Sequence, residues 1–245
     1  MAMQLDILAV VVLTATIQSL LGVGVLLLGT PILLLLGYPF VTALAVLLPI
    51  SLSISLLQVS RHYACIDPQF YKKVLSWSVP CVVLSLFLVT RTVTNIGVIV
   101  GLFLIIVSLK NVSERMNRFI ASMVRYERTY FLAMGIVHGL TNLGGALLAA
   151  IVHGKNYAKD AARATTAASY ATFVVFQLLT LFVALESFPV SFSETAAYVL
   201  AGVVIFLVTE KVVYAKINTD KYRVIFAVFL FVSGVVLIGK ALLAS

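Results

Sequence analysis

The sequence predicts an all-α protein that crosses a membrane several times and consists of two inverted repeats. Hydrophobic residues make up 62% of its 245 residues and charged residues only 11%, whereas soluble domains are about half apolar and a quarter charged. Lipid offers no hydrogen-bond partner to an open sheet edge, so the apolar stretches are expected to be helical. These stretches run over roughly 7–36, 41–60, 74–92, 96–110, 130–153, 164–185, 195–210 and 223–243.

The connectors between the apolar stretches are short and basic. They cover 61–73, 110–129, 154–163 and 211–223, and none has room for a separate soluble domain, so residues 1–245 are expected to form a single membrane domain. A net charge of +8 would suggest nucleic acid in a soluble protein. Here the basic residues lie between apolar runs, so they are interpreted as topology signals and contacts for anionic lipid headgroups. The lipid bilayer is thus an expected partner and nucleic acid is not.

The distribution of Lys and Arg favours two segments that enter the membrane and return to the same side. If all eight stretches cross fully, nine Lys/Arg lie inside and eight outside, which gives no orientation. If 7–36 and 130–153 are re-entrant helical hairpins, fifteen Lys/Arg share one side and only Arg91 and Lys240 lie opposite. The positive-inside tendency then places the connectors in the cytoplasm and both termini outside.

Glycine-rich breaks interrupt both of the stretches that are predicted to return. The first contains Gly22-Val-Gly24 and Gly29-Thr-Pro31, and the second contains Gly139-Leu-Thr-Asn142 and Gly144-Gly145. Each half-crossing needs about ten residues at 1.5 Å per residue. The alternative is that these glycines only allow close helix packing, as small residues commonly do in membranes.

An offset of 117 residues aligns the two hairpins, placing Gly22 on Gly139 and Gly37 on Gly154. Each half then holds one hairpin and three full crossings. Because three is odd, the second half must be inverted relative to the first. The predicted division is repeat 1 at about 5–110, a cytoplasmic linker at about 111–128 and repeat 2 at about 129–243. Inverted repeats with broken helices are a transporter architecture, with the site near the membrane midplane.

The hairpin tips are the candidate binding site, because the N-termini of half-helices present unpaired N–H groups and a positive dipole end to an anion. His138 is expected either to donate to the anion or exchange a proton, or to be a structural histidine bonded to a carbonyl. For each Ser or Thr the alternative is a hydroxyl bonded to its own helix. The candidate residues are Gly22, Gly24, Ser51, Ser53, His138, Thr141, Asn142, Gly144, Gly145, Thr165, Thr166, Ser169 and Gln177.

Motifs for catalysis are missing from the sequence. It has no Gly-x-Ser-x-Gly elbow, no His-Glu-x-x-His and no phosphate loop. Cys65 and Cys81 show no metal-ligand spacing. We therefore expect no catalytic residue, no metal site and no cofactor, and we favour a transporter over a passive anion channel and, more remotely, an intramembrane enzyme.

The sequence resembles the sulfite exporter TauE/SafE family of small bacterial and archaeal transporters. The matching pieces are Gly22-Val-Gly24, Pro31 and Gly37 in the first repeat, and Gly139, Gly144-Gly145 and Ala164-Thr-Thr166 in the second. The sequence departs from the family where Val25-Leu-Leu replaces part of a glycine cluster and where Leu148 stands at the position matching Pro31.

This resemblance implies a secondary transporter of small sulfur-containing anions, of the sulfite and sulfonate class, in the cytoplasmic (inner) membrane. A passive small-anion channel and a carrier of a non-sulfur small anion are the alternatives. The exact substrate, the direction of transport, a coupling ion (proton or sodium) and an oligomeric state are left open by the sequence.

Overall fold

The protein is an all-helical bundle, as predicted. The computed structural model describes residues 4–21, 24–92, 96–115, 118, 122, 125–155, 157–213 and 219–243, and every regular element within these ranges is a helix. A 3-10 turn (Tyr63–Cys65) follows α3, and a π-helical turn (Val74–Ser78) joins α4 to α5. The α-helices are α1 (Leu5–Leu21), α2 (Val25–Leu35), α3 (Phe40–His62), α4 (Pro68–Lys73), α5 (Val79–Thr92), α6 (Gly97–Val112), α8 (Glu127–Thr141), α9 (Gly145–Gly154), α10 (Lys159–Ala184), α11 (Phe192–Val213) and α12 (Thr219–Leu243).

Four stretches within the described residues are long and apolar enough to cross a membrane. They are Phe40–Cys65, Pro68–Arg91, Lys159–Ala184 and Phe192–Lys211. The sequence predicted six full crossings, and the other two would fall on α6 and α12, whose apolar runs are shorter. Large apolar side chains are exposed on these helices: Phe182 and Val183 near the end of α10 are 72% and 73% exposed. Lipid is the environment that suits such an apolar surface.

The chain doubles back between α1 and α2. Tyr38, which follows α2, donates its hydroxyl to Asp6 Oδ2 at 2.6 Å and to Gln4 Oε1 at 2.7 Å. The end of α2 therefore lies beside the start of α1. At the break itself, Gly24 precedes α2, and a Cβ added there would lie 2.6 Å from the Gln18 backbone nitrogen. The break needs glycine because the two arms approach so closely.

The chain doubles back again between α8 and α9. Lys155, directly after α9, forms an ion pair with Glu127 at the start of α8. The turn begins at Asn142, which has φ 63° and ψ 12°. This left-handed conformation ends α8, and Asn adopts it more readily than most non-glycine residues do. At ten residues α9 is about 15 Å long, half the thickness of the hydrocarbon core of a bilayer.

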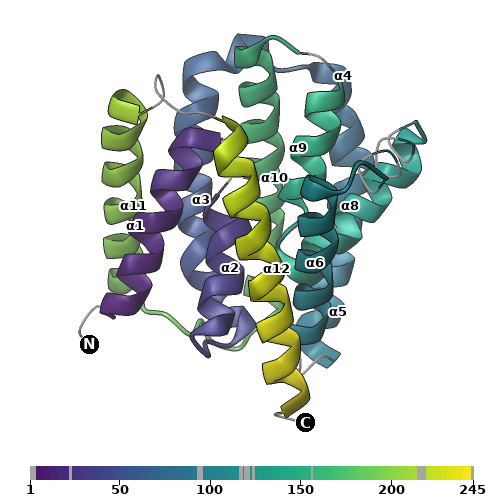
Figure 1. Ribbon diagram of the computed structural model, residues 1–245. Coiled ribbons are helices and arrows are strands. Elements are labelled where there is room, and N and C mark those ends of the chain that lie inside the picture. The colour runs from purple at the N-terminus through teal and green to yellow at the C-terminus, as the bar shows by residue number, and fades with distance from the viewer. Residues whose placement is uncertain are drawn as a thin grey trace.

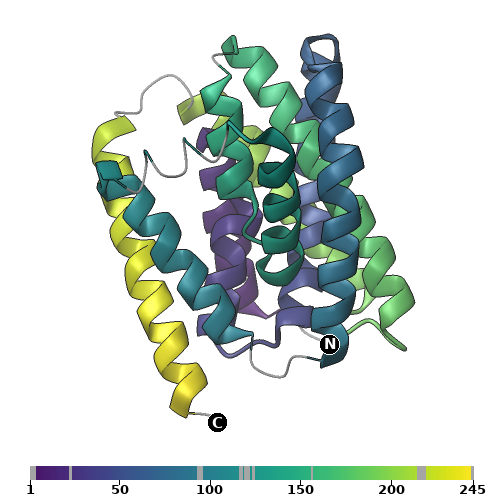
Figure 2. The same cartoon turned by 90° about the vertical axis from the view of Figure 1, so that its right-hand side faces the viewer.

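The helices from the two halves of the sequence pack against each other in matching pairs. α3 packs against α10 and α6 against α12, while α1 packs against α11 and α5 against α8. Figure 2 shows α6 and α12 side by side along one flank of the bundle. This last contact is close: a Cβ added at Gly101 would lie 2.7 Å from the Gly234 carbonyl oxygen, and one at Gly234 would lie 2.7 Å from that of Gly101.

One end of the bundle, here called the connector end, gathers the turns that link α3 to α4 and α9 to α10. Tyr157 donates its hydroxyl to Asp67 Oδ2 at 2.5 Å, and this bond holds the pKa of the Asp67 carboxyl below its usual range. At the same end Glu210 of α11 forms ion pairs with Arg61 and Arg163. The basic connectors thus meet at one end of the bundle.

The opposite end, here called the terminal end, holds both termini (Figure 1). The backbone N–H of Gln4 donates to the Tyr198 hydroxyl at 3.0 Å, near the start of α11. The Lys240 ammonium, in the last turn of α12, donates to the Leu35 carbonyl at 2.6 Å. The first and last helices therefore begin and end at the same side of the bundle.

Candidate functional site

A buried network of neutral polar side chains crosses the molecule at the second break. Gln177 of α10 is its centre: its Nε2 donates to Asn142 Oδ1 at 3.2 Å, and its Oε1 lies 3.1 Å from His138 Nε2. Asn142 Nδ2 in turn donates to Thr30 Oγ1 of α2 at 2.9 Å. All four residues are buried, so the network joins the second break to the arm that follows the first.

Hydrogen bonds within the second break shape its backbone. The Asn142 N–H donates to the His138 carbonyl at 2.8 Å, which closes the last turn of α8. The Leu143 N–H donates to Thr141 Oγ1 at 3.2 Å. Gly145 then begins α9 beside the network, and the N–H groups of Ala146, Leu147 and Leu148 donate to the Leu143 and Gly144 carbonyls. The start of a helix combines N–H donors with the positive end of the helix dipole.

Tyr170 of α10 presses its hydroxyl against the start of α9. A Cβ added at Gly145 would lie 1.2 Å from Tyr170 Oη, so no larger residue fits there without moving the ring. Gly144 is also confined, though less tightly, because a Cβ added there would lie 2.5 Å from the His138 Cβ. The two glycines bring the α9 N-terminus within reach of side chains from α8 and α10.

The first break is capped in a different way. The Val25 N–H, the first of α2, donates to Gln18 Oε1 at 2.9 Å. Gln18 is buried at the end of α1, so one arm supplies the side chain that caps the other. Gly24, predicted as a site residue, sits between them. Gly22, also predicted, lies outside the residues that the structure describes.

Five buried side-chain polar atoms have no hydrogen-bond partner among the described residues. They are Ser51 Oγ, both amide atoms of Gln58, His138 Nδ1 and Tyr170 Oη. Buried polar groups are nearly always hydrogen-bonded, and each exception calls for an explanation. An anion bound at the break would supply an acceptor for the Tyr170 hydroxyl, which lies against Gly145.

Some of the predicted site residues bond elsewhere. Ser53 donates to the Pro49 carbonyl at 2.9 Å, and Ser169 donates to the Thr165 carbonyl at 2.8 Å, so both hydroxyls serve their own helices. Thr165 accepts the Asp67 N–H at 3.0 Å, which places it at the connector end. Thr166 is buried on the same helix.

The structure adds residues that sequence reasoning left out of the site. Thr30 joins the network from within the Gly29-Thr-Pro31 break, Gln18 caps α2, and Gln58 is buried with its amide unpaired. Only Gln58 had a usable signal: it follows Ser51 by seven residues, a spacing that puts both on one helix face. Tyr170 joins the site through its contact with Gly145.

The site is electrically neutral. Its hydrogen-bonded members are amides, a hydroxyl and an imidazole, while the described ion pairs gather at the connector end. Within the described part of the chain, His, Cys, Asp and Glu form no group of three that could hold a metal ion. Such a layer can stabilise a small anion through N–H and O–H donors, and it presents no fixed charge to a cation.

Comparison with known proteins gives the chain a family. No curated protein and no solved structure matches it. The family model described as "Sulfite exporter TauE/SafE" matches residues 7–237, nearly the whole chain. Members of this family are membrane transporters, which agrees with the several apolar helices of this chain. The protein is therefore a multi-pass membrane protein. The chain therefore belongs to the sulfite exporter TauE/SafE family.

Proposed function

We propose that the protein is a secondary transporter that moves small sulfur-containing anions, of the sulfite and sulfonate class, across the cytoplasmic membrane. The observation that carries this proposal is the neutral buried network at the second break, next to the α9 N-terminus. Family membership supports the substrate class. The anion lies between the two breaks, where it accepts hydrogen bonds from backbone N–H groups, Asn142 and the Tyr170 hydroxyl.

Neutral donors suit a substrate that must be released again. A hydrogen bond to a charged group contributes about 1.5–3 kcal/mol, so two or three of them hold an anion without trapping it. A buried Lys or Arg at the same depth would cost more to desolvate and would bind the anion more tightly. The N-terminal dipole of α9 adds to the attraction without a formal charge.

We further propose that α1–α2 and α8–α9 are re-entrant hairpins within two inverted repeats, at about 5–110 and 129–243. The matching helix pairs support this, because exchanging the repeats exchanges α1–α11 with α5–α8. The hairpin bases support it too. Tyr38 and Asp6 close the first at the terminal end, while Lys155 and Glu127 close the second at the connector end. If the second repeat is inverted relative to the first, the closed bases of the two hairpins must lie at opposite ends of the bundle.

The connector end faces the cytoplasm in this proposal, and both termini face outward. Fifteen of the 17 Lys and Arg lie in the connector segments 61–73, 110–129, 154–163 and 211–223. The positive-inside tendency favours that side for them. A coupling ion, proton or sodium, and an oligomer are further possibilities within this function.

Cysteine labelling tests the topology. After Cys65 and Cys81 are replaced by serine, single cysteines at Ser113 and Asn156 should react with an impermeant reagent only from the cytoplasmic side. A cysteine at Ser191 should react only from outside. Labelling of the Ser113 and Asn156 positions from opposite faces would mean that 130–153 crosses fully, and the hairpin proposal would fail.

Exchange in reconstituted vesicles tests the function. Vesicles holding purified protein and internal sulfite should take up labelled sulfite saturably, and a short sulfonate should compete. A carrier accelerates uptake when unlabelled substrate is present inside, whereas a passive channel does not. Uptake of a neutral or cationic solute with no response to any anion would refute the proposed substrate class.

A further inference from the structure

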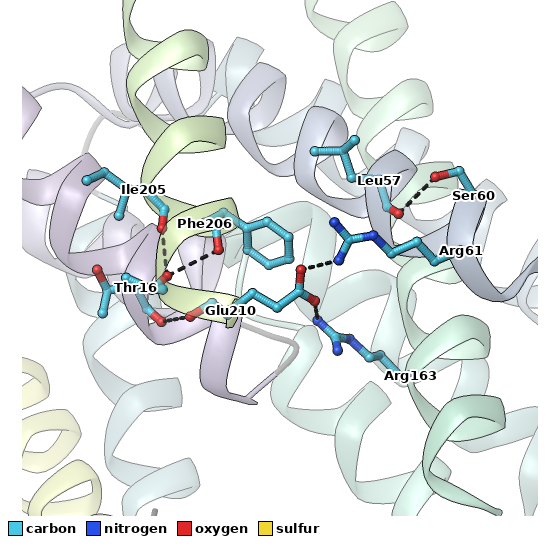
Figure 3. A network of polar contacts seen from close by, with 10 residues as sticks. Thr16, Leu57, Ser60, Arg61, Arg163, Ile205, Phe206 and Glu210 are labelled. Atoms are coloured by element: carbon cyan, nitrogen blue, oxygen red, sulfur yellow. Dashed lines mark hydrogen bonds and ion pairs between the residues drawn. The ribbon is translucent and has the colours of Figure 1, made fainter. Parts of the chain in front are cut away.

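A single carboxylate bridges two arginines at the connector end. Figure 3 shows Glu210 of α11 reaching between Arg61, at the end of α3, and Arg163, near the start of α10. Each carboxylate oxygen has its own partner: Oε2 pairs with Arg61 Nη1 and Oε1 with Arg163 Nη2. Two guanidinium groups from the two halves of the chain therefore converge on one oxyanion.

Two of the three charged side chains in this cluster are poorly exposed to solvent. The Glu210 side chain is 10% exposed, that of Arg163 14% and that of Arg61 43%. One carboxylate against two guanidinium groups leaves a net charge of +1. An excess positive charge with little solvent around it attracts anions more strongly than an exposed one does. The guanidinium fork also matches the spacing of oxygens in a carboxylate, sulfite or sulfonate group.

A second carboxylate at the same end has a similar arrangement with different chemistry. Glu127 lies between Lys73 and Lys155, and all three side chains are between 28% and 43% exposed. Lysine ammonium groups are strongly hydrated point charges without a fork. Exposed ion pairs of this kind contribute little. The Glu127 cluster is therefore a natural control for the Glu210 cluster.

A buried polar stripe on α3 leads inward from Arg61. Ser51, Ser55 and Gln58 follow one another at spacings of four and three residues, so they share one face of the helix, and all three are buried. Gln58 lies one turn from Arg61, and neither of its amide atoms has a partner among the described residues. An unpaired buried amide next to an arginine suits a polar solute in transit.

A matching stripe on α10 leads inward from Arg163. Thr166, Tyr170 and Gln177 lie three, seven and fourteen residues further on, again on one helix face, and all are buried. The stripe ends at the network on Asn142, to which Gln177 donates. α3 packs against α10, so both stripes lie on the same packed pair of helices.

We propose that Arg61 and Arg163 form an anion-binding site at the connector end, called here the arginine site, which a sulfite or sulfonate group occupies by displacing Glu210. In the absence of the anion, the Glu210 carboxylate occupies the site and pairs with both arginines. The anion must therefore compete with Glu210 for the two guanidinium groups. The inference rests on the proposed function for the identity of the anion. It adds a second site on the path between the connector end and the break.

The arginine site predicts opposite effects for its members. Glu210→Gln removes the competing charge, so the concentration of anion that half-fills the site should fall about tenfold, the equivalent of one charged hydrogen bond. Arg163→Gln removes one fork and should raise that concentration at least about tenfold. Arg61→Gln should do the same more weakly, because Arg61 is more exposed. Glu127→Gln should leave it unchanged.

The test reads the arginine site locally. Ser60 is exposed next to Arg61 on α3, and a cysteine placed there, in a protein with Cys65 and Cys81 replaced by serine, reports on the site. Its rate of reaction with an anionic methanethiosulfonate is measured at increasing methanesulfonate, which is chemically inert toward the reagent. Methanesulfonate should protect this cysteine, at concentrations that the variants shift as stated.

The outcomes separate this inference from the proposed function. Equal protection in Glu210→Gln, Glu127→Gln and the parent, or unchanged protection in both Arg61→Gln and Arg163→Gln, overturns the arginine site. If labelled sulfite is still exchanged in vesicles at the same time, the transport function stands. If protection follows the predicted order but no anion is transported, the site stands and the transport function fails. A neutral methanethiosulfonate, whose rate should not respond to methanesulfonate, serves as the reagent control.

Discussion

Removing the Tyr170 hydroxyl separates stability from substrate binding. Tyr170 is buried against Gly145, and its hydroxyl has no hydrogen-bond partner among the described residues. Tyr170→Phe therefore breaks no bond within the protein and relieves a buried polar group of its desolvation cost. We expect the free energy of unfolding to stay unchanged or rise. If the hydroxyl donates to the bound anion, the same change should weaken binding.

A second buried tyrosine supplies the scale and the control. Tyr130 donates its hydroxyl to the Leu147 carbonyl at 2.8 Å. Tyr130→Phe removes this hydrogen bond, so it should lower the free energy of unfolding by about 0.5–1.5 kcal/mol. For Tyr170→Phe the loss falls instead on the anion: a hydrogen bond to a charged group contributes about 1.5–3 kcal/mol, which corresponds to a roughly 10- to 100-fold weaker affinity.

Two assays on the same preparations measure these effects. Thermal unfolding in detergent reports stability, and the concentration dependence of labelled sulfite exchange in vesicles reports apparent affinity. The account predicts a stable Tyr170→Phe protein with weakened affinity, and a destabilised Tyr130→Phe protein. Wild-type affinity in Tyr170→Phe would refute the role of the hydroxyl in binding the anion. A loss of stability equal to that of Tyr130→Phe would refute the claim that the Tyr170 hydroxyl makes no hydrogen bond within the protein.

Further predictions concern the break and the connector end. Gly145→Ala places a methyl group on the Tyr170 hydroxyl and should lower the free energy of unfolding by about 1–3 kcal/mol. The control is Gly154→Ala in the same helix, where the added methyl group meets no atom within 4 Å and should not lower the free energy of unfolding. Equal melting temperatures for the two variants would contradict this packing. The hydrogen bond from Tyr157 lowers the pKa of Asp67 from an ordinary 3.8, so its contribution to stability is present above that pH and is lost as pH falls through the lowered pKa. Asp67→Asn should therefore have a lower melting temperature at neutral pH, and its melting temperature should fall less steeply below about pH 4. If the melting temperatures of Asp67→Asn and the parent fall equally below about pH 4, this role of Asp67 is excluded.

The sequence was sufficient for the helices and for where the chain turns. Gly24, Gly144 and Gly145 lie where the chain doubles back, because the closely packed backbone there leaves no room for a larger residue. The charge distribution predicted that the four connectors share one side, and the ion pairs of Glu210 and Glu127 bring three of them, 61–73, 110–129 and 154–163, together. The hairpin topology relative to the membrane stays a prediction.

The composition of the site was only partly predictable. His138, Asn142 and Gln177 were all expected and do form one network, but Thr30 and Gln18 were missed. Their roles depend on how the two halves of the chain dock, over sequence separations that no local pattern records. Serine and threonine were the least predictable type, because a hydroxyl on a helix bonds equally well to its own backbone.

The same difficulty applies to Thr165 and Ser169. Both precede Gln177 on α10, and their hydroxyls bond to Asp67 and to the helix itself. The sequence predicted that they line the helices beside the tips, but α10 begins at Lys159, so Thr165 lies in its second turn. Thr165 therefore lies near the connector end, beside Asp67, whereas Tyr170 and Gln177 lie further along α10, at the break.

The most direct test of the account is to locate the anion itself. Selenite is a heavier analogue of sulfite, and the anomalous scattering of selenium marks its position in a crystal of the protein. The account predicts selenium at the second break, with an oxygen about 3 Å from the Tyr170 hydroxyl or the Asn142 amide. Binding of selenite with no selenium between the two breaks, in protein that exchanges sulfite, would contradict the claim that neutral donors at the broken helices hold the substrate.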